Sequence, residues 1–525
     1  MKRRQFIHTV PVAVGGMTMT AYASSPMLRA LSESLYDTDR VLIVVQLNGG
    51  NDGLNTVFPL DQYDTLLKFR SNLLMPSDKI LTLSGNGGAT GIHPAMYRFK
   101  ELYDKNQLAI IQGVGYPSFN FSHFRASDIW VSGSDAKEDL NSGWLGRYVN
   151  YEYPNYPVGF PNPTMPDPPA IRIGSNVGLG LQNNNLNMGI SINNTNDPLN
   201  LTGNIYKDPV SADCLGKEVA FVREIQRQTD KFGDAVSAAG KKGVNMSTLY
   251  SASGNSLSDA LKIVAKLISG GLKTRIYWVN MGGFDNHSSQ TNAADRSTGT
   301  QATLLGRVSD AIYAFMDDMR LQGFEDRILG MTFSEFGRRV MSNASGGTDH
   351  GAAQPMFVFG KKIIPGILGK NATIDPNTTV NSNVAMQYDF RSVYASILRD
   401  WFCVPSVDLE SVMLHKFQPL PLLDTGNCIP TYTHEQNNKA GENLVYAYPN
   451  PFVDRTSIKF ESKGGYSIVQ IFSNEGVLIR QVYEGELPEG SYKMDVEMGE
   501  VPEGIYYIRV QTGIYQQVKN ILKVR

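Results

Sequence analysis

The sequence has few cysteines, almost no net charge and no long apolar segment. Its 525 residues include three cysteines, Cys214, Cys403 and Cys428, which fit no zinc-ligand spacing and cannot form a disulfide framework. A single bridge from Cys403 to Cys428 is possible outside the cytoplasm, although nothing in the sequence demands it. The net charge of −2 gives no support to a nucleic-acid partner, and we expect none. No stretch approaches the roughly 18 unbroken apolar residues of a membrane span, so we expect no transmembrane segment.

The first 23 residues have the pattern of a cleaved export signal. They begin with basic residues, continue through a modest apolar stretch and reach a small-x-small site at Ala21-Tyr22-Ala23. The pair Arg3-Arg4 resembles a twin-arginine signal, which would make the twin-arginine translocase a partner. A chance arginine pair in an ordinary export signal is the alternative. We therefore exclude residues 1–23 from the fold and expect export through the periplasm.

Strand patterns alternate with helical patterns over residues 41–425. The strand patterns are continuous apolar runs, typical of strands buried on both faces: VLIVVQL (41–47), LAIIQGVG (108–115), TRIYWVNMGG (274–283), RILGMTFSEFG (327–337) and PMFVFG (355–360). The helical patterns are PAMYRFKELYDK (94–105), SHFRASDIWVS (122–132), DALKIVAKLIS (259–269), LLGRVSDAIYAFMDDMRLQ (304–322) and DFRSVYASILRDWF (389–402). This alternation predicts an α/β domain with a mostly parallel sheet sandwiched by helices.

The pattern changes after a polar segment, residues 426–443, which predicts a linker. Residues 444–525 contain short alternating runs separated by turn signals at 474–476, 488–490 and 502–504. They predict a small C-terminal antiparallel β-sandwich. This segment contains no histidine and no cysteine, so we expect no chemistry in it.

The C-terminal segment also resembles a known targeting domain. Its motifs YPNPF and GIYY, followed by a late lysine, resemble the C-terminal sorting domain of the type IX secretion system of Bacteroidetes. The resemblance covers residues 445–525. It implies that the type IX secretion machinery is a partner, and that the protein is secreted or displayed on the cell surface, where the domain is usually removed.

Four segments of the α/β domain place acids or histidines at or near strand ends. In an open parallel sheet, ligands bind at the carboxyl ends of the strands. Carboxylates and imidazoles without thiolates suit zinc or manganese, and an all-oxygen subset suits magnesium or calcium. The segments NGGNDGLN, GGFDNH, FSEFGRR and GGTDHG therefore predict a metal site with the ligands Asp52, Asp285, His287, Glu335, Asp349 and His350.

A hydroxyl nucleophile is suggested by YPSFNFSHFRASDIW (116–130). Ser122 lies near the predicted N-terminus of a helix, where the helix dipole favours an anionic substrate. Serine is also a preferred N-cap in any protein, and Asn120, His123 or Arg125 are alternative participants. Arg125 or Arg338 could bind the oxygens of the substrate.

The remaining histidines are interpreted more simply. His93 precedes a helical pattern and is predicted to cap it. His415 and His434, near the linker, are given no role.

The motifs of the α/β domain resemble a bacterial family of unknown function, DUF1501. They run in the order of that family and cover most of residues 41–402: VVQLNGGNDGLNTVFPL, GVGYPSFNFSHFRASDIW, GWLGRYV, GGFDNH, TFSEFGRRV, GGTDHGAAQPMFVFG and DFRSVYASILRDWF. The family is similar in turn to the alkaline phosphatase and sulfatase superfamily. The resemblance implies an alkaline phosphatase-like fold.

The superfamily resemblance also implies roles for individual residues. Asp52 matches the ligand after the first strand, and Ser122 falls at the place of the nucleophile. Asp285 with His287 matches an acid-histidine pair, although the family spacing of four is shortened to two. His350 matches the final histidine, with Asp349 beside it.

Two departures bear on the function. Glu335 stands where the superfamily has an Asp-His pair, so a second metal site lacks a ligand unless Asp349 or His123 supplies it. The sulfatase motif Cys-x-Pro-Ser-Arg has only the counterpart CVPSV at Cys403, which lacks the arginine and follows all ligand candidates. An ordinary sulfatase is therefore not expected.

The sequence thus predicts an exported metal-dependent hydrolase of phosphate or sulfate esters. We expect one or two divalent ions, zinc or manganese, and a small anionic ester as substrate. The alternative is a secreted non-catalytic binding or scaffold protein that retains the phosphatase-like fold.

Overall fold

The computed structural model describes residues 39–195 (except 155, 158, 163 and 164), 219, 231–424 (except 407), 428, 445–473, 477–512 and 515–524. These residues form two compact units, one within Thr38–Cys428 and one within Ile429–Arg525. The expected export signal, residues 1–23, and all of the expected linker except Cys428 lie outside the described residues, as does His434.

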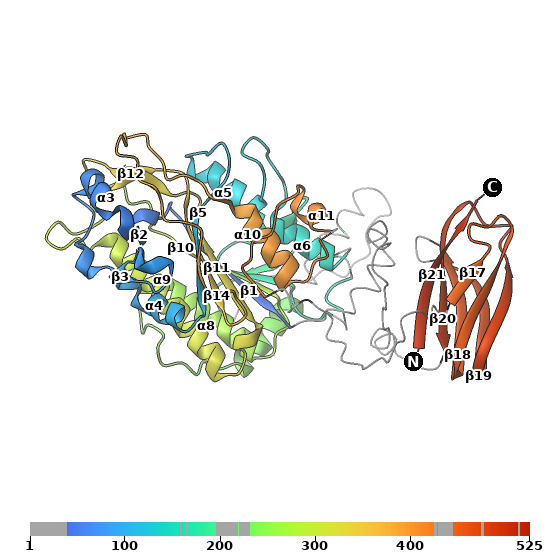
Figure 1. Ribbon diagram of the computed structural model, residues 1–525. Coiled ribbons are helices and arrows are strands. Elements are labelled where there is room, and N and C mark those ends of the chain that lie inside the picture. Colours follow the sequence, from blue (N-terminus) through green and yellow to red (C-terminus); the bar gives the residue numbers. More distant parts are fainter. Residues whose placement is uncertain are drawn as a thin grey trace. The chain divides into compact units, whose positions relative to one another are not determined.

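The larger unit is built on a central sheet of nine strands among its described residues (Figure 1). The strand order is β15-β5-β14-β11-β1-β10-β6-β9, and β16 also pairs with β5. Their bounds are β1 (Val41–Leu47), β5 (Leu108–Gly115), β6 (Ala170–Ile173), β9 (Ile190–Ile192), β10 (Ile276–Met281), β11 (Ile328–Phe333), β14 (Gln354–Gly360), β15 (Gly366–Leu368) and β16 (Tyr388–Asp389).

The prediction of a mostly parallel sheet is confirmed. Strands β10 and β11 pair in parallel with β1 on either side of it, and every residue of β1 is buried. Of the strands in this sheet that the structure describes, only β14 runs against its neighbours, pairing antiparallel with β11 and β5. Burial on both faces explains why the strands are apolar at every position rather than at alternate ones.

Helices cover both faces of the sheet (Figure 1). One layer contains α4 (Tyr97–Asp104), α8 (Ser256–Ser269) and α9 (Thr300–Leu321); the other contains α5 (His123–Ser132), α6 (Trp144–Glu152), α10 (Phe390–Ser396) and α11 (Leu409–Met413). Stacked rings hold the second layer, with Trp130 against Phe390 and Trp144 against Tyr394 at centroid distances of 4.3 and 4.1 Å. The helix expected over 389–402 is α-helical only to Ser396 and continues as a π-helix over Ile397–Trp401.

Smaller elements surround this core. They are α3 (Tyr63–Arg70), β2 (Val57–Pro59), β3 (Leu81–Thr82), β4 (Thr90–Ile92), β7 (Gln182–Asn183), β8 (Leu186–Asn187), β12 (Arg338–Ser342) and β13 (Thr348–His350). Cys403 and Cys428 form a disulfide, which settles the pairing that the sequence left open. His93 caps the short helix at Pro94–Met96 by accepting a hydrogen bond from the backbone N–H of Ala95, so that prediction is confirmed.

The C-terminal unit is antiparallel, as predicted, but has fewer and longer strands than its turn signals suggested. The described strands are β17 (Val445–Tyr448), β18 (Arg455–Ser473), β19 (Leu478–Glu497), β20 (Gly504–Thr512) and β21 (Tyr515–Lys523). The turn predicted at 488–490 is wrong, because these residues continue β19 in register with β18. The signal at 474–476 lies outside the described residues, and 502–504 does separate β19 from β20.

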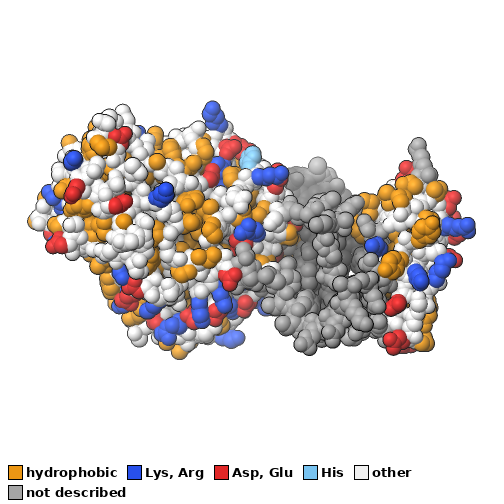
Figure 2. All heavy atoms as spheres, viewed as in Figure 1, with side chains coloured by type: hydrophobic (Ala, Val, Ile, Leu, Met, Phe, Trp, Pro, Cys, Tyr) orange, Lys and Arg blue, Asp and Glu red, His pale blue; other side chains and the backbone are white. Residues whose placement is uncertain are grey.

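Charges of both signs are interspersed over the visible face (Figure 2), as a net charge of −2 leads one to expect. Within the described ranges, no helix combines the length and the apolarity needed to cross a membrane.

Candidate metal centre

Three imidazoles and two carboxylates from four segments meet at one edge of the central sheet. His123 is the first residue of α5, Asp285 and His287 follow β10, Glu335 follows β11, and His350 is the last residue of β13. The edge is the one at which β1, β10 and β11 end, where parallel sheets bind ligands.

The reversed direction of β14 explains how His350 reaches this edge. His350 precedes β14 in the sequence, so in an all-parallel sheet it would lie at the opposite edge. Because β14 runs antiparallel to β11, its first residues lie at the carboxyl edge. The short strand β13 then pairs with β12, which sets His350 opposite Arg338.

The Nε2 atoms of three histidines face Asp285. Those of His287 and His350 lie 3.0 and 3.3 Å from Oδ1 of Asp285, and that of His123 lies 3.4 Å from Oδ2. The Nε2 atoms of His287 and His350 are themselves 2.9 Å apart. Ligand atoms of His123, Asp285 and His350 lie within 4.8 Å of one another, close enough to contact one ion.

The Nδ1 atoms of the same histidines face oxygens on the other side of each ring. Nδ1 of His350 lies 2.7 Å from the carbonyl oxygen of Phe121, and Nδ1 of His123 lies 2.8 Å from Oε1 of Glu335. Nδ1 of His287 lies 3.4 Å from Oδ1 of Asp349. A carbonyl only accepts, so the proton of a neutral His350 is on Nδ1, and its Nε2 carries a lone pair.

This arrangement fits a bound cation. Burial lowers the pKa of His350, although the carbonyl of Phe121 raises it, and the neutral imidazole is favoured overall. The lone pair on its Nε2 then faces a carboxylate oxygen and a second imidazole nitrogen, and such groups repel one another unless a cation or a proton lies between them. Histidines that bind metals characteristically donate their other ring N–H to a carboxylate or a backbone carbonyl.

Arg338 holds the loops of the site together from beneath. Its side chain is fully buried, and its guanidinium donates to Oδ1 of Asp285 at 2.8 Å. The other hydrogen bonds go to backbone carbonyls on three loops, those of Gly49, Gly50, Phe284 and Thr348. Its donors are thus turned to the protein itself, which gives Arg338 a structural role rather than the substrate contact expected from the sequence.

Both exposed carboxylates of the site are kept ionised. Partial burial opposes ionisation of Asp285, but the hydrogen bond and charge of Arg338, together with His287 and His350, lower its pKa overall. The pKa of Asp349 is lowered chiefly by a hydrogen bond from Asn343, against a smaller effect of burial. Both groups therefore offer negative charge to a cation.

The glycines around the cluster are required by close backbone contacts. A Cβ atom at Gly347 would lie 2.3 Å from the carbonyl carbon of His287, and one at Gly351 would lie 2.2 Å from that of Arg338. At Gly49, which has a φ of +124°, a Cβ would lie 2.3 Å from the backbone nitrogen of Asp285. The glycines of GGTDHG therefore allow its loop to pack directly against the loop that carries His287.

Glu335 lies deeper than the other carboxylate of the cluster. It is 2% exposed and accepts hydrogen bonds from the backbone N–H of Gly49 at 2.8 and 3.0 Å. Its Oε1 also lies 2.8 Å from Nδ1 of His123. These contacts orient the imidazole of His123 toward Asp285.

The structure does not bring Asp52 into the cluster. Asp52 is buried, and its Oδ2 pairs with Arg70 at 2.6 Å and accepts from Gln290 at 2.7 Å. Its Oδ1 is buried without a hydrogen-bond partner among the described residues. A guanidinium therefore stands beside the carboxylate for which the sequence suggested a metal ion.

Ser122 and Arg125 lie close to His123 in the sequence, but their side chains have different surroundings. Ser122 is the N-cap residue of α5, is exposed, and its hydroxyl makes no capping hydrogen bond. The guanidinium of Arg125 points along the following loop, where it pairs with Asp139 at 2.7 Å and donates to the backbone carbonyls of residues 135, 136 and 138. Arg125 is therefore not among the residues brought to the cluster.

Two contributors were not selected from the sequence as site residues. His123 was considered only as an alternative, and its place directly after Ser122 was the available signal. Asn343 donates to Oδ1 of Asp349 at 3.0 Å and to the carbonyl of His287 at 2.9 Å. An asparagine in a hairpin turn carries no sequence signal for this role.

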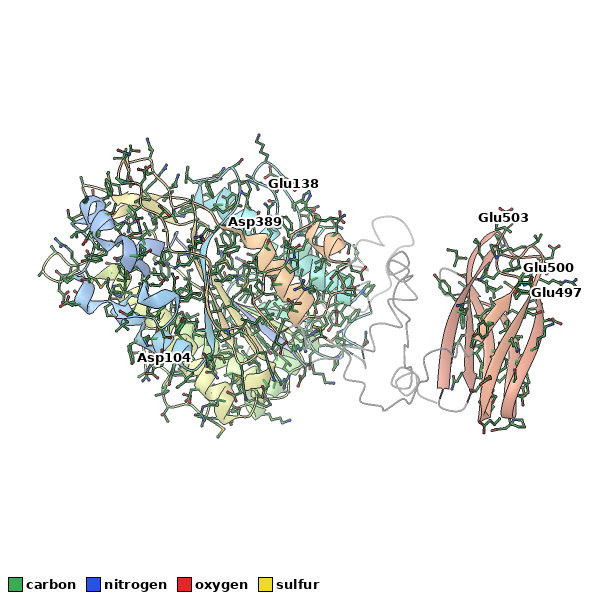
Figure 3. All side chains as sticks on the ribbon, in the orientation of Figure 1. Asp104, Glu138, Asp389, Glu497, Glu500 and Glu503 are labelled. Atoms are coloured by element: carbon green, nitrogen blue, oxygen red, sulfur yellow. A yellow bond between two sulfur atoms is a disulfide. The ribbon has the colours of Figure 1, made fainter. Side chains whose placement is uncertain are left out.

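A second group with ligand-like spacing is formed by the loop that follows α5 and a residue just after α11. It consists of Asp135, Glu138 and His415, and Figure 3 labels Glu138 on this loop. Arg391 already pairs with Asp135, and Arg125 binds the carbonyls of the same loop. These guanidinium groups supply the positive charge there.

The fold and the cluster together define an α/β protein with a candidate metal centre and a separate antiparallel C-terminal unit. Residues 112–391 match the family described as a protein of unknown function, DUF1501. This match spans more than half of the 525 residues, and the chain belongs to that family. Residues 446–524 match the secretion system C-terminal sorting domain, which indicates type IX secretion and a cell-surface or extracellular location.

No curated protein matches the chain. Similar solved structures include Ps i-CgsB, at 10% identity and a TM-score of 0.31, covering 72% of this chain and 73% of that one. A sulfatase from Pseudoalteromonas sp. has 10% identity and a TM-score of 0.29, with 90% of both chains covered. An alkaline phosphatase from the Antarctic bacterium TAB5 has 11% identity and a TM-score of 0.24, covering 63% and 95%. At these TM-scores the likenesses carry no argument about function.

Proposed function

We propose that the α/β domain is an exported metal-dependent hydrolase of phosphate or sulfate esters. The observation that carries the proposal is the convergence of three Nε2 atoms on Asp285, each imidazole having an oxygen at its Nδ1. We assign one divalent ion, zinc or manganese, to Asp285, His287, His350 and His123. The ester class is suggested by the order of the motifs, which resembles that of the alkaline phosphatase superfamily.

The other site residues have supporting roles in this proposal. Asp349 and Glu335 orient the imidazoles of His287 and His123. Removal of such an orienting group typically lowers metal affinity by about 10- to 100-fold. Asp52 remains with Arg70, and this pairing favours one ion over two. A metal bound here would supply Lewis acidity to an ester oxygen.

The residues of the chain would position the reactants. Ser122, exposed at the start of α5, is our candidate nucleophile, because it directly precedes His123. The backbone N–H groups at the start of α5 favour the anionic group of the ester. Arg338 would act through Asp285, whose position and ionisation it maintains.

The route to the outside follows from the two ends of the chain. We propose that residues 1–23 direct the chain to the twin-arginine translocase and that residues 444–525 then engage the type IX machinery. The catalytic domain would span residues 41–425, joined to the sorting domain by residues 426–443.

A non-catalytic binding or scaffold protein is the second candidate. It is favoured by Asp52, whose carboxylate pairs with Arg70 where the resemblance implied a metal ligand. Metal analysis of the mature chain followed by a screen of phosphate and sulfate esters separates the candidates. About one ion per chain with turnover supports the hydrolase. One ion without turnover on any ester supports the scaffold, and a metal-free protein contradicts the proposed centre.

A further inference from the structure

Two exposed aromatic residues lie next to candidate metal ligands along the chain. Phe124 is 86% exposed and directly follows His123, while Phe121 is 37% exposed and binds His350 through its carbonyl. Single exposed apolar side chains are ordinary on protein surfaces. Two exposed phenylalanines that bracket the candidate ligand His123, one of which contacts His350 through its carbonyl, are a more specific arrangement.

A guanidinium lies against the ring of Phe121. The carbon at the centre of the Arg339 guanidinium is 4.8 Å from the ring centroid of Phe121, a cation–π distance. The same guanidinium donates to the carbonyl of Asn381, next to Val380, which is 65% exposed. Apolar surface and positive charge thus lie together at Phe121, whose carbonyl contacts His350.

The centre itself is open to solvent. The side chains of Asp285, His287 and His123 are 45%, 44% and 34% exposed, so a ligand can reach them from outside. A bound ester would keep its alcohol portion outside the cluster of imidazoles and carboxylates. The groups at the border then contact that portion.

We propose that Phe121, Phe124 and Arg339 form a platform that binds a ring-bearing alcohol portion of an anionic ester. This inference rests on the proposed function and adds a substrate class to it. Phenylalanine faces stack on flat apolar ring faces, as aromatic groups and the faces of sugar rings provide. Arg339 supplies the charge that attracts the anionic group.

The test compares three ligands on the full chain by calorimetry: phenyl phosphate, glucose 1-phosphate and ethyl phosphate. Stacking on Phe124 should make at least one ring ligand bind about 3- to 10-fold more tightly than ethyl phosphate. Phe124→Ala should abolish this preference without weakening ethyl phosphate, and Phe124→Trp should restore it. Preference for the phenyl ligand identifies an aryl group, and preference for the glucose ligand identifies a sugar.

Two further variants separate charge from stacking. Arg339→Gln should weaken all three anions together and leave the ring preference. Tyr446→Ala, a 48% exposed aromatic of the C-terminal unit, should change nothing. Equal affinity for all three ligands, or a preference that survives in Phe124→Ala, would overturn the platform. Ring preference in binding without turnover or bound metal would instead refute the proposed hydrolase and leave the platform standing.

Discussion

His350 and Asp285 lie 65 residues apart in the sequence, and their side chains meet at 3.3 Å. The same oxygen of Asp285 accepts a hydrogen bond from Arg338 and lies 3.0 Å from Nε2 of His287. One carboxylate oxygen is therefore the common neighbour of two imidazoles and a buried guanidinium. The predictions for the metal ligands and for Arg338 follow from this crowding.

Asp285→Ala, His287→Ala and His350→Ala should each abolish tight metal binding, since ligands of one ion act together. His350→Ala should cost little stability, because its loop packs mainly through glycine backbone contacts. Zinc and manganese contents are measured by mass spectrometry, with thermal melts to confirm folding. His415→Ala is the control, because His415 lies with Asp135 and Glu138 instead. A folded His350→Ala protein with full metal content would refute the assignment.

Asp349→Ala should weaken metal binding without abolishing it. Its carboxylate contacts Nδ1 of His287 and not the Nε2 side of the cluster, so the affinity should fall by about 10- to 100-fold. Competition with a chelator measures the change. Complete loss of metal would mean that Asp349 is itself a ligand.

Arg338→Met should destabilise the α/β domain strongly. The substitution leaves four buried backbone carbonyls without their donor, and an unsatisfied buried polar group typically costs about 1–3 kcal/mol. Arg338→Lys should recover only part of this, since an ammonium cannot reproduce the planar fork. Urea unfolding measures the difference, with the exposed Arg320→Lys as a control within about 0.5 kcal/mol. A mild effect of Arg338→Met would show that the loops are held by other contacts.

The free energy of unfolding should fall as the pH drops from 6.5 toward 4. Burial lowers the pKa of His93 to about 4 in the folded protein, whereas the unfolded chain takes up the proton near 6.5. Protons therefore favour the unfolded state in this window, by up to about 3 kcal/mol.

His93→Asn tests the origin of this pH dependence. Asparagine can accept the capping hydrogen bond from Ala95 but does not titrate. The free energy of unfolding of the His93→Asn protein should be lower than that of the unsubstituted protein at neutral pH. It should also change less between pH 6.5 and 4. Identical pH dependence in both proteins would assign the effect to other groups.

Reduction of the Cys403–Cys428 disulfide should destabilise the α/β domain by about 3 kcal/mol, as closure of a loop with this separation of 25 residues suggests. Thermal melts with and without dithiothreitol measure the change. Cys403→Ser should melt at the lower temperature and show no further response to the reductant. An unchanged melting temperature on reduction would contradict the prediction.

Deletion of residues 444–525 should retain the protein in the periplasm with its metal content intact. Replacement of Arg3-Arg4 by two lysines should block export altogether if the twin-arginine route is used. Fractionation of cells expressing each variant locates the protein. Normal secretion of the truncated chain would contradict the sorting role, and undiminished export of the lysine variant would indicate the general secretory route.

Most of the central sheet could be predicted from the sequence, because strands buried on both faces leave continuous apolar runs. The runs at 41–47 and 108–115 coincide with β1 and β5. The antiparallel direction of β14 could not be predicted, because the apolar pattern of a buried strand is the same for either direction. In the C-terminal unit, Pro488 and Gly490 suggested a turn, but the pairing of β18 with β19 overrides that local signal.

The ligands of the candidate site could be predicted where a single segment contains an acid or a histidine in a distinctive setting. Asp285, His287 and His350 stood out as acids and histidines between glycines, and the structure brings them together. The pairing of Asp52 with Arg70 could not be foreseen, because Arg70 lies on α3 and reaches Asp52 only through the tertiary fold. His123 was considered only as an alternative, because the hydroxyl of the preceding Ser122 made that serine the first choice in this segment.

The disulfide also determines how the α/β domain bears mechanical load. A pull on the chain beyond Cys428, as during engagement of the sorting domain by a secretion machine, passes through the covalent bridge to Cys403. The described residues between the two cysteines therefore lie outside that line of force. Arg40 donates to the carbonyl of Trp401 at 2.8 Å, so the start of the domain is fastened at the same corner. The force is therefore applied at a corner where residues from both ends of the domain are bonded to each other. This corner is distant in sequence from the histidines of the metal centre.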